Sequence, residues 1–151
     1  MRDAILTLPT QLKWSPNVEG GAIPPAEHFL LCGMGGSALA GGLILACDPN
    51  LPLTLHRDYG LPFKSESDQA GTLVIISSFS GNTEETLDAY RTAKEAKRPL
   101  IVVTSGGELL SRARRDVVPY VVIPDAKIQP RLAVGYFLRA LALITSAEAI
   151  S

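Results

Sequence analysis

The sequence predicts an α/β fold, a three-layer α/β/α sandwich in which helices cover both sides of a five-stranded parallel sheet. Segments of strand type alternate with segments of helix type from residue 28 to near the end of the chain. Several of the strand segments are apolar on both faces, which is typical of strands that lie between two layers of helices. We expect right-handed crossovers between these parallel strands.

The first 27 residues do not follow this alternation. Ile5, Leu8 and Leu12 follow one another at three- and four-residue steps, which favours a short amphipathic helix that Pro9 interrupts or delays. Residues 15–27 hold three prolines and two adjacent glycines, the composition of a loop. We therefore expect an N-terminal helical appendage and loop over 1–27, followed by one domain over 28–151.

Five segments are predicted to be strands. They are residues 28–32, 52–57, 73–76, 100–104 and 117–123. The third is the clearest, because its four consecutive residues are apolar and three of them are β-branched. The fifth contains Pro119, which favours an edge position because proline cannot donate a hydrogen bond to the sheet.

Helices are predicted after the turns that follow the first, third and fourth strands, and a last helix is predicted from Pro130 nearly to Ser151. Apolar residues cover almost the whole circumference of this last helix. Because one face cannot bury them all, we expect more protein to pack against residues 131–150. That protein would be a second copy, giving a homodimer, or a second domain.

The turn after the third strand gathers three hydroxyl-bearing residues, Ser78, Ser80 and Thr83, at the start of a helix. Unpaired backbone N–H groups and the positive end of the helix dipole point at such a turn, so it favours an anion such as a phosphate. The alternative is that Ser80 or Asn82 only caps the helix, with a glutamate nearby completing a capping box.

The turn after the first strand is rich in glycine and contains Gly35, Gly36 and Ser37. In a parallel sheet both turns lie at the carboxyl ends of strands, where they can face each other across one crevice, and this favours a binding site. Residues 33–38 also match the loose dinucleotide fingerprint G-x-G-x-x-A, with Asp58 downstream to meet a ribose. Asp58 falls past its strand, however, and the fingerprint gives no role to the hydroxyl-rich turn. A nicotinamide-binding domain remains an alternative.

The composition limits the possible partners. Charged residues make up 19% of the chain, hydrophobic ones 46%, and the net charge is −1, so neither disorder nor a field that attracts polyanions is indicated. The one basic cluster, Arg112, Arg114 and Arg115, has no aromatic residues interleaved for base stacking. We therefore expect no nucleic-acid partner.

The cysteines and the apolar segments bear on cofactors and location. Cys32 and Cys47 lack a CxxC or metal-ligand spacing, so we expect buried thiols in a reducing compartment, no metal and no cofactor. The longest apolar run, 132–144, is interrupted by Arg139 and is too short to span a bilayer, and the N-terminus shows no export signal. We expect a soluble, cytoplasmic protein without a membrane partner.

Four segments, 33–37, 57–62, 78–85 and 130–136, occur in this order and span nearly the whole chain. Together they resemble the first half of the bifunctional phosphoglucose/phosphomannose isomerases, which belong to the sugar isomerase (SIS) domain superfamily. The serine-glycine-threonine turn alone marks the superfamily, whereas 57–62 and 130–136 point to this family. The resemblance implies a flavodoxin-like SIS domain that binds a sugar phosphate.

The resemblance also implies roles for individual residues. The phosphate of an aldose or ketose 6-phosphate would be held by Ser78, Ser80 and Thr83, and the sugar would contact the glycine turn at Gly35, Gly36 and Ser37. Arg131 matches an arginine that stabilises the enediolate formed when a proton moves between C1 and C2. A fixed cation suits that role because negative charge develops on the sugar oxygens as the proton leaves.

This chain departs from the family pattern because it lacks the residues that move protons in the family. In the family, the glutamate base and the ring-opening histidine come from the second half of the chain or from a partner subunit. The two histidines here, His28 and His56, match no such motif and are expected to be structural or surface residues. Glu84 and Glu85 head a helix beside the predicted phosphate, where a carboxylate would repel it unless turned away.

Two functions therefore remain open from the sequence. The first is the N-terminal half of an aldose–ketose isomerase acting on glucose 6-phosphate or mannose 6-phosphate and fructose 6-phosphate, catalytically incomplete alone. A general base contributes on the order of a hundred- to ten-thousandfold to a proton transfer, so its loss would be severe. The second is a stand-alone sugar-phosphate-binding module, a sensor or regulatory partner.

Overall fold

A computed structural model of the chain describes residues 8–65, 67, 70–125 and 127–146. Six strands form one sheet in the order β1-β6-β5-β4-β2-β3. Their bounds are β1 (Val18–Glu19), β2 (His28–Gly33), β3 (Leu53–His56), β4 (Thr72–Ser78), β5 (Leu100–Thr104) and β6 (Tyr120–Val122). Strands β2 to β6 are parallel. If they are numbered 1 to 5 along the chain, they lie across the sheet in the order 2-1-3-4-5, which is that of flavodoxin-like folds. The predicted α/β fold class is confirmed.

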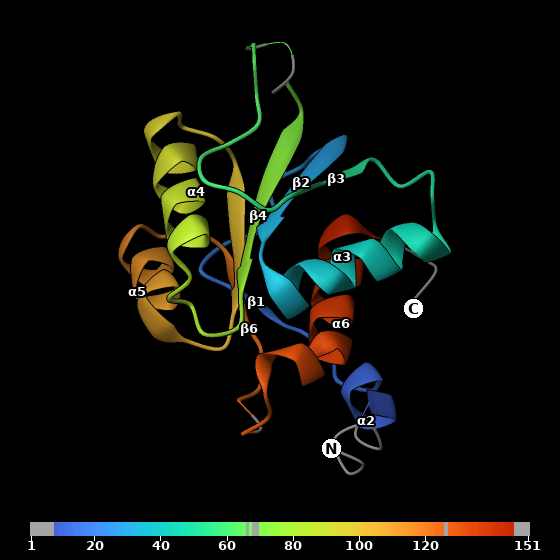
Figure 1. Ribbon diagram of the computed structural model, residues 1–151. Helices are drawn as coiled ribbons and strands as arrows, with labels where there is room; N and C mark the ends of the chain where they lie inside the picture. Colours follow the sequence, from blue (N-terminus) through green and yellow to red (C-terminus); the bar gives the residue numbers. More distant parts are fainter. Residues whose placement is uncertain (1–7, 66, 68–69, 126, 147–151) are drawn as a thin grey trace.

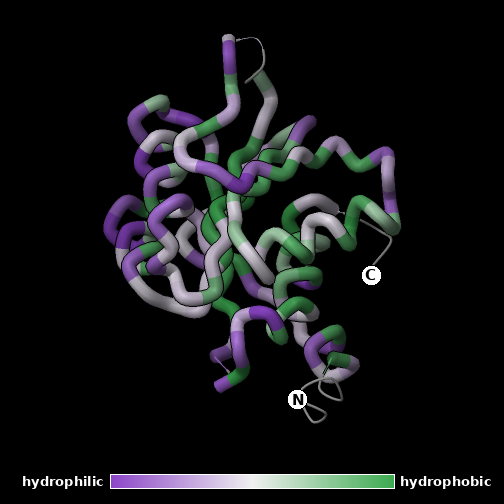
Figure 2. The backbone as a smooth tube through the Cα atoms, viewed as in Figure 1, coloured by the Kyte–Doolittle hydropathy of each residue, from purple (hydrophilic) through white to green (hydrophobic). Residues whose placement is uncertain are grey.

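Helices cover both faces of the sheet, as the sequence predicts (Figure 1). On one face lie α3 (Gly35–Cys47) and α6 (Val134–Thr145), and on the other lie α4 (Glu84–Glu95) and α5 (Gly107–Arg115). Every residue of β4 is buried, with Leu73 and Ile75 in the core under α3 and α6 and Val74 and Ile76 in the core under α4 and α5. Figure 2 shows the contrast between the apolar interior and the more hydrophilic outer helices α4 and α5.

The sheet has six strands where the sequence predicts five. The additional strand, β1, has two residues and pairs antiparallel with β6, which is too short a stretch to leave a pattern in the sequence. It lies outside β6, so the predicted edge position of the strand with Pro119 is wrong for the sheet as a whole. Pro119 itself precedes β6, and its carbonyl oxygen accepts a hydrogen bond from the N–H of Val102.

The N-terminal segment is joined to the domain at two places. Besides β1, the short helix α2 (Leu8–Leu12) packs against α6. The buried Gln11 side chain donates to the carbonyl of Leu132 (2.8 Å) and accepts from the N–H of Gly135 (3.0 Å). The rings of Trp14 and Tyr136 meet edge to face, with centroids 5.4 Å apart. Ile5, at the start of the predicted helix, lies outside the described residues.

The predicted last helix is divided in two. A 3-10 turn, η2 (Pro130–Leu132), is followed by α6, which ends at Thr145. Most of α6 is buried, because α2, α3 and the sheet surround it, and Leu143 is its most exposed apolar residue at 39%. Much of the apolar surface expected to need further protein over residues 131–150 is therefore covered by the chain itself. Residues 147–151, in the predicted last turn, lie outside the described residues.

The two cysteines differ in exposure. Cys32 is buried in β2 as predicted, and burial raises the pKa of its thiol to about 12. Cys47 is exposed, contrary to prediction, because it ends α3 where that helix extends past the sheet (Figure 1). Within the described part of the chain, no helix is long and apolar enough to cross a membrane. The cytoplasmic location stays a prediction.

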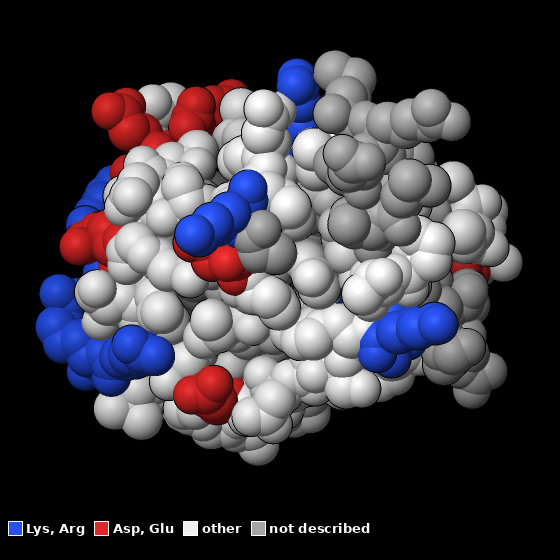
Figure 3. All heavy atoms as spheres, turned by 90° about the horizontal axis from the view of Figure 1, so that it is seen from below, with Lys and Arg blue, Asp and Glu red and all other residues white. Residues whose placement is uncertain are grey.

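Figure 3 shows the charges on the face seen from below. Lys and Arg atoms stand there in separate groups on a surface that is mostly neither acidic nor basic. The expectation that nucleic acid is not a partner stays a prediction from the net charge.

Candidate functional site

The two turns singled out in the sequence adjoin at the carboxyl edge of the sheet. β2 and β4 are neighbours, with Gly33 opposite Ser77, so the glycine turn and the hydroxyl turn leave adjacent strands side by side. From β2 the chain moves to β3 on one side, and from β4 it moves to β5 and β6 on the other. This reversal is the switch point at which open α/β sheets bind their ligands.

The hydroxyl groups of the second turn face one another. Ser78 Oγ and Thr83 Oγ1 are 2.9 Å apart, and the N–H of Gly81 donates to Ser78 Oγ at 3.2 Å. Ser80 Oγ accepts from the N–H of Asn82 at 3.2 Å, which closes a local turn. The structure thus brings Ser78 and Thr83 together and holds Ser80 on the same turn.

Neither residue of the capping alternative caps α4. The N-cap position of α4 is Thr83, and its side chain makes no capping hydrogen bond. The side chain of Asn82 points instead to the neighbouring helix, where its Oδ1 accepts from the N–H of Glu108 in α5 at 3.0 Å. The first N–H groups of α4 are therefore left for a ligand, and such a helix end favours an anion.

The hydroxyl turn is supported from behind by the turn between β5 and α5. The hydroxyl of Ser105 donates to the carbonyl of Phe79 (2.6 Å), and the N–H of Leu109 donates to the carbonyl of Gly81 (2.9 Å). Gly81 has a φ of +69°, and a β-carbon there would collide with the backbone of Gly106. The two turns therefore fit only with glycine at this contact. The contact of Ser105 with the hydroxyl turn was not predicted, although the Ser-Gly-Gly run after the fourth strand indicates a tight turn.

The segment that contains Arg131 packs against the glycine turn. Gly35 has a φ of +51°, and a β-carbon on Gly36 would lie 2.9 Å from the carbonyl oxygen of Pro130 and 3.0 Å from the Cα of Arg131. The absence of a side chain at Gly36 thus lets η2 rest on the start of α3. Arg131 is exposed there, beside the glycine turn, while Ser37 is 5% exposed and faces the interior.

The loop after β3 forms a third side of the site. The N–H of Gly60 donates to Asp88 Oδ2 of α4 at 2.8 Å, and the hydroxyl of Tyr59 donates to Glu84 Oε2 at 3.2 Å. The hydrogen bond to Glu84 raises the pKa of Tyr59, and hydrogen bonds from Arg91 and then Gly60 lower the pKa of Asp88. This loop holds the Glu84 carboxylate on the side of Tyr59, next to the hydroxyl turn.

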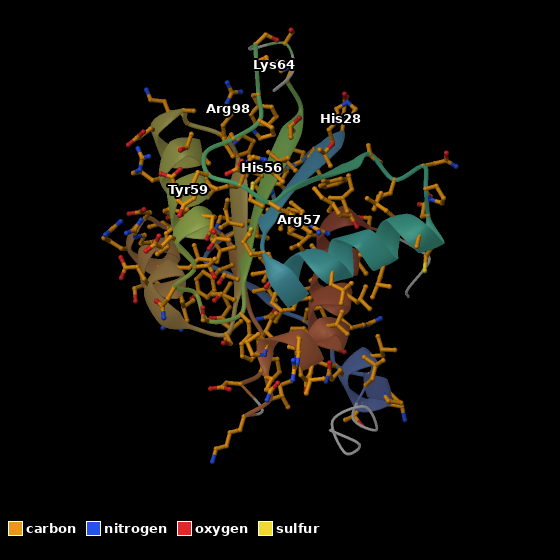
Figure 4. The ribbon with its side chains drawn as sticks, viewed as in Figure 1. His28, His56, Arg57, Tyr59, Lys64 and Arg98 are labelled. Carbon is orange, nitrogen blue, oxygen red and sulfur yellow. The ribbon has the colours of Figure 1, made fainter. Side chains whose placement is uncertain are left out.

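The histidines lie as expected of structural or surface residues. His28 is exposed at the start of β2, at the amino edge of the sheet, away from the turns (Figure 4). His56 ends β3, and its Nε2 lies 3.2 Å from the carbonyl oxygen of Tyr59. Among the described residues, no group of three or more His, Cys, Asp or Glu side chains is placed to hold a metal ion.

A hollow of about 650 Å³ lies near the amino ends of β2 and β4, and its lining includes His28, Phe63, Lys64 and Thr72. None of the predicted site residues lines it. We assign the candidate site to the carboxyl edge, because the hydroxyl groups, the free helix end and Arg131 are there.

Solved structures define the fold class. The chain has a TM-score of 0.62 to a hypothetical protein of Thermus thermophilus, at 24% identity over 97% of this chain and 38% of that one. The sugar isomerase domain of an RpiR transcription factor from Sphaerobacter thermophilus gives 0.56, at 20% identity over 98% and 90%. The Vibrio vulnificus NanR protein, complexed with ManNAc-6P, gives 0.57, at 16% identity over 97% and 59%. The chain has the fold of a sugar isomerase (SIS) domain.

Sequence comparison names the relatives more closely, although no protein-family model matches the chain. A bifunctional phosphoglucose/phosphomannose isomerase of Caldicellulosiruptor bescii is 38% identical over 147 residues, 90% of this chain and 41% of the relative. One of Thermoplasma volcanium is 33% identical, over 92% and 42%. A D-glucosamine-6-phosphate 4-epimerase of Sulfolobus acidocaldarius is 32% identical, over 81% and 38%.

The chain is therefore a relative of the bifunctional phosphoglucose/phosphomannose isomerases, as the four segments predict. It spans about two fifths of the length of the curated relatives it matches.

Proposed function

We propose that this chain binds a phosphorylated sugar at the carboxyl edge of its sheet and supplies one half of the site of an aldose–ketose isomerase. Glucose 6-phosphate, mannose 6-phosphate and fructose 6-phosphate are the substrates proposed. The observation that carries the proposal is the uncapped start of α4 beside paired hydroxyl groups, 2.9 Å apart, next to a turn that carries an exposed arginine. The names of the relatives support the same chemistry.

Each side of the site has a proposed role. The hydroxyl groups of Ser78, Ser80 and Thr83 and the free N–H groups of α4 would bind the phosphate, which has oxygens enough to accept from several donors. Gly35, Gly36 and Ser37 would contact the sugar at the other end. A ligand between these turns would meet hydrogen-bond donors at its phosphate and the Ser37 hydroxyl at its ring or chain.

Arg131 is the proposed catalytic residue. Moving a proton between C1 and C2 leaves negative charge on the sugar oxygens, and a guanidinium group stabilises that charge without itself losing a proton. Isomerisation also needs a base, and Glu84, the carboxylate at the start of α4, is bonded to Tyr59. We therefore propose that the base comes from a second SIS domain and that this chain alone is catalytically incomplete.

A second candidate function is a stand-alone sugar-phosphate sensor. The same fold occurs in NanR, which was solved with ManNAc-6P, and in the sugar isomerase domain of an RpiR transcription factor. Calorimetry with glucose 6-phosphate and a turnover assay to fructose 6-phosphate, both on the purified chain, separate the candidates. Saturable binding without turnover, restored to turnover by a second domain, supports the isomerase half. Binding that no second domain converts to turnover supports the sensor, and turnover by the chain alone contradicts its incompleteness.

The phosphate assignment has its own test. The double variant Ser80→Ala/Thr83→Val should weaken glucose 6-phosphate binding on the order of tenfold or more, since each hydrogen bond to a charged group contributes about 1.5–3 kcal/mol. Thr92→Val, on the third turn of the same helix, is the matched control and should bind like the wild type. Unchanged affinity in the double variant would refute the assignment, and NADH titration tests the dinucleotide alternative.

We also propose that a second copy or a second SIS domain packs beside α3 and α6. Leu39 and Leu43 lie one turn apart on α3 and are 46% and 40% exposed. Large apolar side chains that share a helix face in this way favour a protein partner. The residues 131–150 predicted for this contact contribute less, because α6 is mostly buried within the chain.

A further inference from the structure

A buried hydroxyl group lies under the glycine turn and has no role in the site described so far. Ser77 is completely buried near the end of β4, and its Oγ has no hydrogen-bond partner among the described residues. A buried hydroxyl without a partner is destabilising, and an apolar residue at that position would avoid this loss of stability. The preceding residues of β4, from Leu73 to Ile76, are all apolar. Ser77 therefore stands out as a polar residue that packing alone does not require.

The side chain of Ser77 faces the start of α3. It lies on the same side of the sheet as Ile75, under α3 and α6, whereas Ser78 faces Thr83 on the other side. Its partner in the register is Gly33, the last residue of β2. A β-carbon on Gly33 would lie 3.6 Å from Cβ of Ser77 and 3.5 Å from Cβ of Ser37. The two serine side chains thus flank the same small space, which Gly33 leaves open.

Ser37 is the interior residue of the glycine turn and is assigned to the sugar in the proposed function. A serine hydroxyl can donate one hydrogen bond and accept two, and its direction is set by the groups around it. Among the described residues, no side-chain hydrogen bond fixes the direction of the Ser37 hydroxyl. Ser77 carries a buried hydroxyl, and its Cβ, like that of Ser37, borders the position that a β-carbon on Gly33 would take.

We propose that Ser77 is a positioning residue for Ser37. Its hydroxyl donates to a bridging water molecule in the space left by Gly33, that water donates to Ser37 Oγ, and this directs the Ser37 proton toward a sugar oxygen. The inference rests on the proposed function for the contact between Ser37 and the sugar, but not for the contact between the two serines. A β-carbon on Gly33 would lie 2.9 Å from the carbonyl oxygen of Ser77, so the backbone already favours glycine there, and its absence of a side chain also keeps the space between the two serines open.

The binding test uses Ser77→Ala and Ser77→Cys, which both remove the hydroxyl while cysteine keeps the volume. Both should weaken glucose 6-phosphate binding about three- to tenfold by calorimetry and leave the affinity for inorganic phosphate unchanged, because the phosphate groups are on the other side of β4. Thr72→Val, the buried hydroxyl at the amino end of the same strand, is the matched control. Wild-type affinity for glucose 6-phosphate in both Ser77 variants would overturn the proposal.

A double-mutant cycle with Ser37→Ala separates this inference from the proposed function. The expected result is that Ser37→Ala/Ser77→Ala binds no more weakly than Ser37→Ala alone, and that the two substitutions are also non-additive in urea unfolding without ligand. Should the wild type bind no sugar phosphate, the proposed function fails while the unfolding cycle still tests the serine pair. Additive losses in both measurements would overturn the link between Ser77 and Ser37.

Discussion

The hydrogen bond from Tyr59 to Glu84 fixes the direction of an acidic side chain beside the proposed anion site. Glu84 is the first residue of α4, so its carboxylate lies close to the N–H groups proposed to bind phosphate. In Tyr59→Phe the carboxylate loses its donor and is free to turn toward the phosphate. We expect glucose 6-phosphate affinity to fall about two- to fivefold at low salt and less at about 1 M salt, where the Debye length is about 3 Å.

The same pair supplies the control for this prediction. Glu84→Gln removes the charge, so adding Tyr59→Phe to Glu84→Gln should change the affinity little. Calorimetry of the four proteins at two salt concentrations measures the effect. An equal loss with and without the Glu84 charge would show that Tyr59 acts by some means other than holding that carboxylate.

Val117 adopts a backbone conformation that suits glycine. It follows the last turn of α5 with a φ of +52°, and it is 75% exposed. The N–H of Val118 donates to the carbonyl of Ala113 at 2.9 Å, the bond of a Schellman motif, in which this position is usually glycine. A β-branched side chain is strained there, at a cost of about 1–2 kcal/mol.

We therefore expect Val117→Gly to raise the free energy of unfolding by about 0.5–1 kcal/mol, after allowing for the greater entropy of glycine in the unfolded chain. Urea unfolding should show a higher midpoint at an unchanged slope. Val117→Ala is the control, because it removes the exposed methyl groups but keeps the β-carbon, and its gain should be smaller. A lower midpoint for the glycine variant would mean that the valine side chain makes a contact worth more than the strain.

At the scale of elements, Asn82 joins two helices. It belongs to the turn before α4 but caps α5, whose own N-cap residue, Gly106, has no side chain to offer. We expect Asn82→Ala to lower the free energy of unfolding by about 1 kcal/mol, the usual loss of an N-cap. Asn82→Asp keeps the acceptor and should lose less.

The exposed Asn50, in the loop after α3, offers a matched control, and Asn50→Ala should change the unfolding midpoint little. If Asn82→Ala were equally mild, the hydrogen bond to Glu108 would not stabilise α5. Because Asn82 also fixes the hydroxyl turn against the turn at Ser105, thermal melts with and without glucose 6-phosphate show whether its loss acts on the fold or on binding.

The elements differ in how far sequence can predict them. Strand β4 was predictable because its apolar residues must be buried on both faces, and no other local structure hides them as well. Strand β1 was not, because Val18 and Glu19 are a strand only through their pairing with β6. The role of Asn82 was missed for the same reason: its acceptor serves a helix 26 residues away in the chain. Local patterns carry no record of such contacts.

The candidate site shows a similar division. The hydroxyl turn was predicted from the serine and threonine residues between a buried strand and a helix, and its place beside the glycine turn was predicted from the parallel sheet and is confirmed, while its binding of phosphate stays a prediction. The position of Arg131 rested on the resemblance alone, and it is the lack of a side chain on Gly36 that lets its segment rest on α3. The burial of α6 by α2 depends on Gln11 and Trp14, near the other end of the chain.

At the scale of the whole molecule, the surface of α3 bears on assembly. Leu39 and Leu43 are exposed on one side of α3, on the layer of the sandwich that also holds α6. Because these side chains are 46% and 40% exposed, covering them would contribute about 1 kcal/mol each, roughly half of what burying a fully exposed leucine contributes. We expect the purified chain to show a mass above the 16.1 kDa of a monomer in light scattering at tens of micromolar, rising with concentration.

The substitution Leu43→Glu should return the mass to that of a monomer, because a carboxylate buried in an apolar contact without a partner is costly. The control is Val117→Glu, which places the same charge on an exposed apolar residue of the opposite layer and should leave association unchanged. A monomer at every concentration in the wild type would contradict self-association and leave a second SIS domain as the partner of α3. Equal loss of association in both variants would instead point to a general effect of charge. Because the base is proposed to come from a second SIS domain, self-association alone should give no turnover, and Leu43→Glu should retain sugar-phosphate binding.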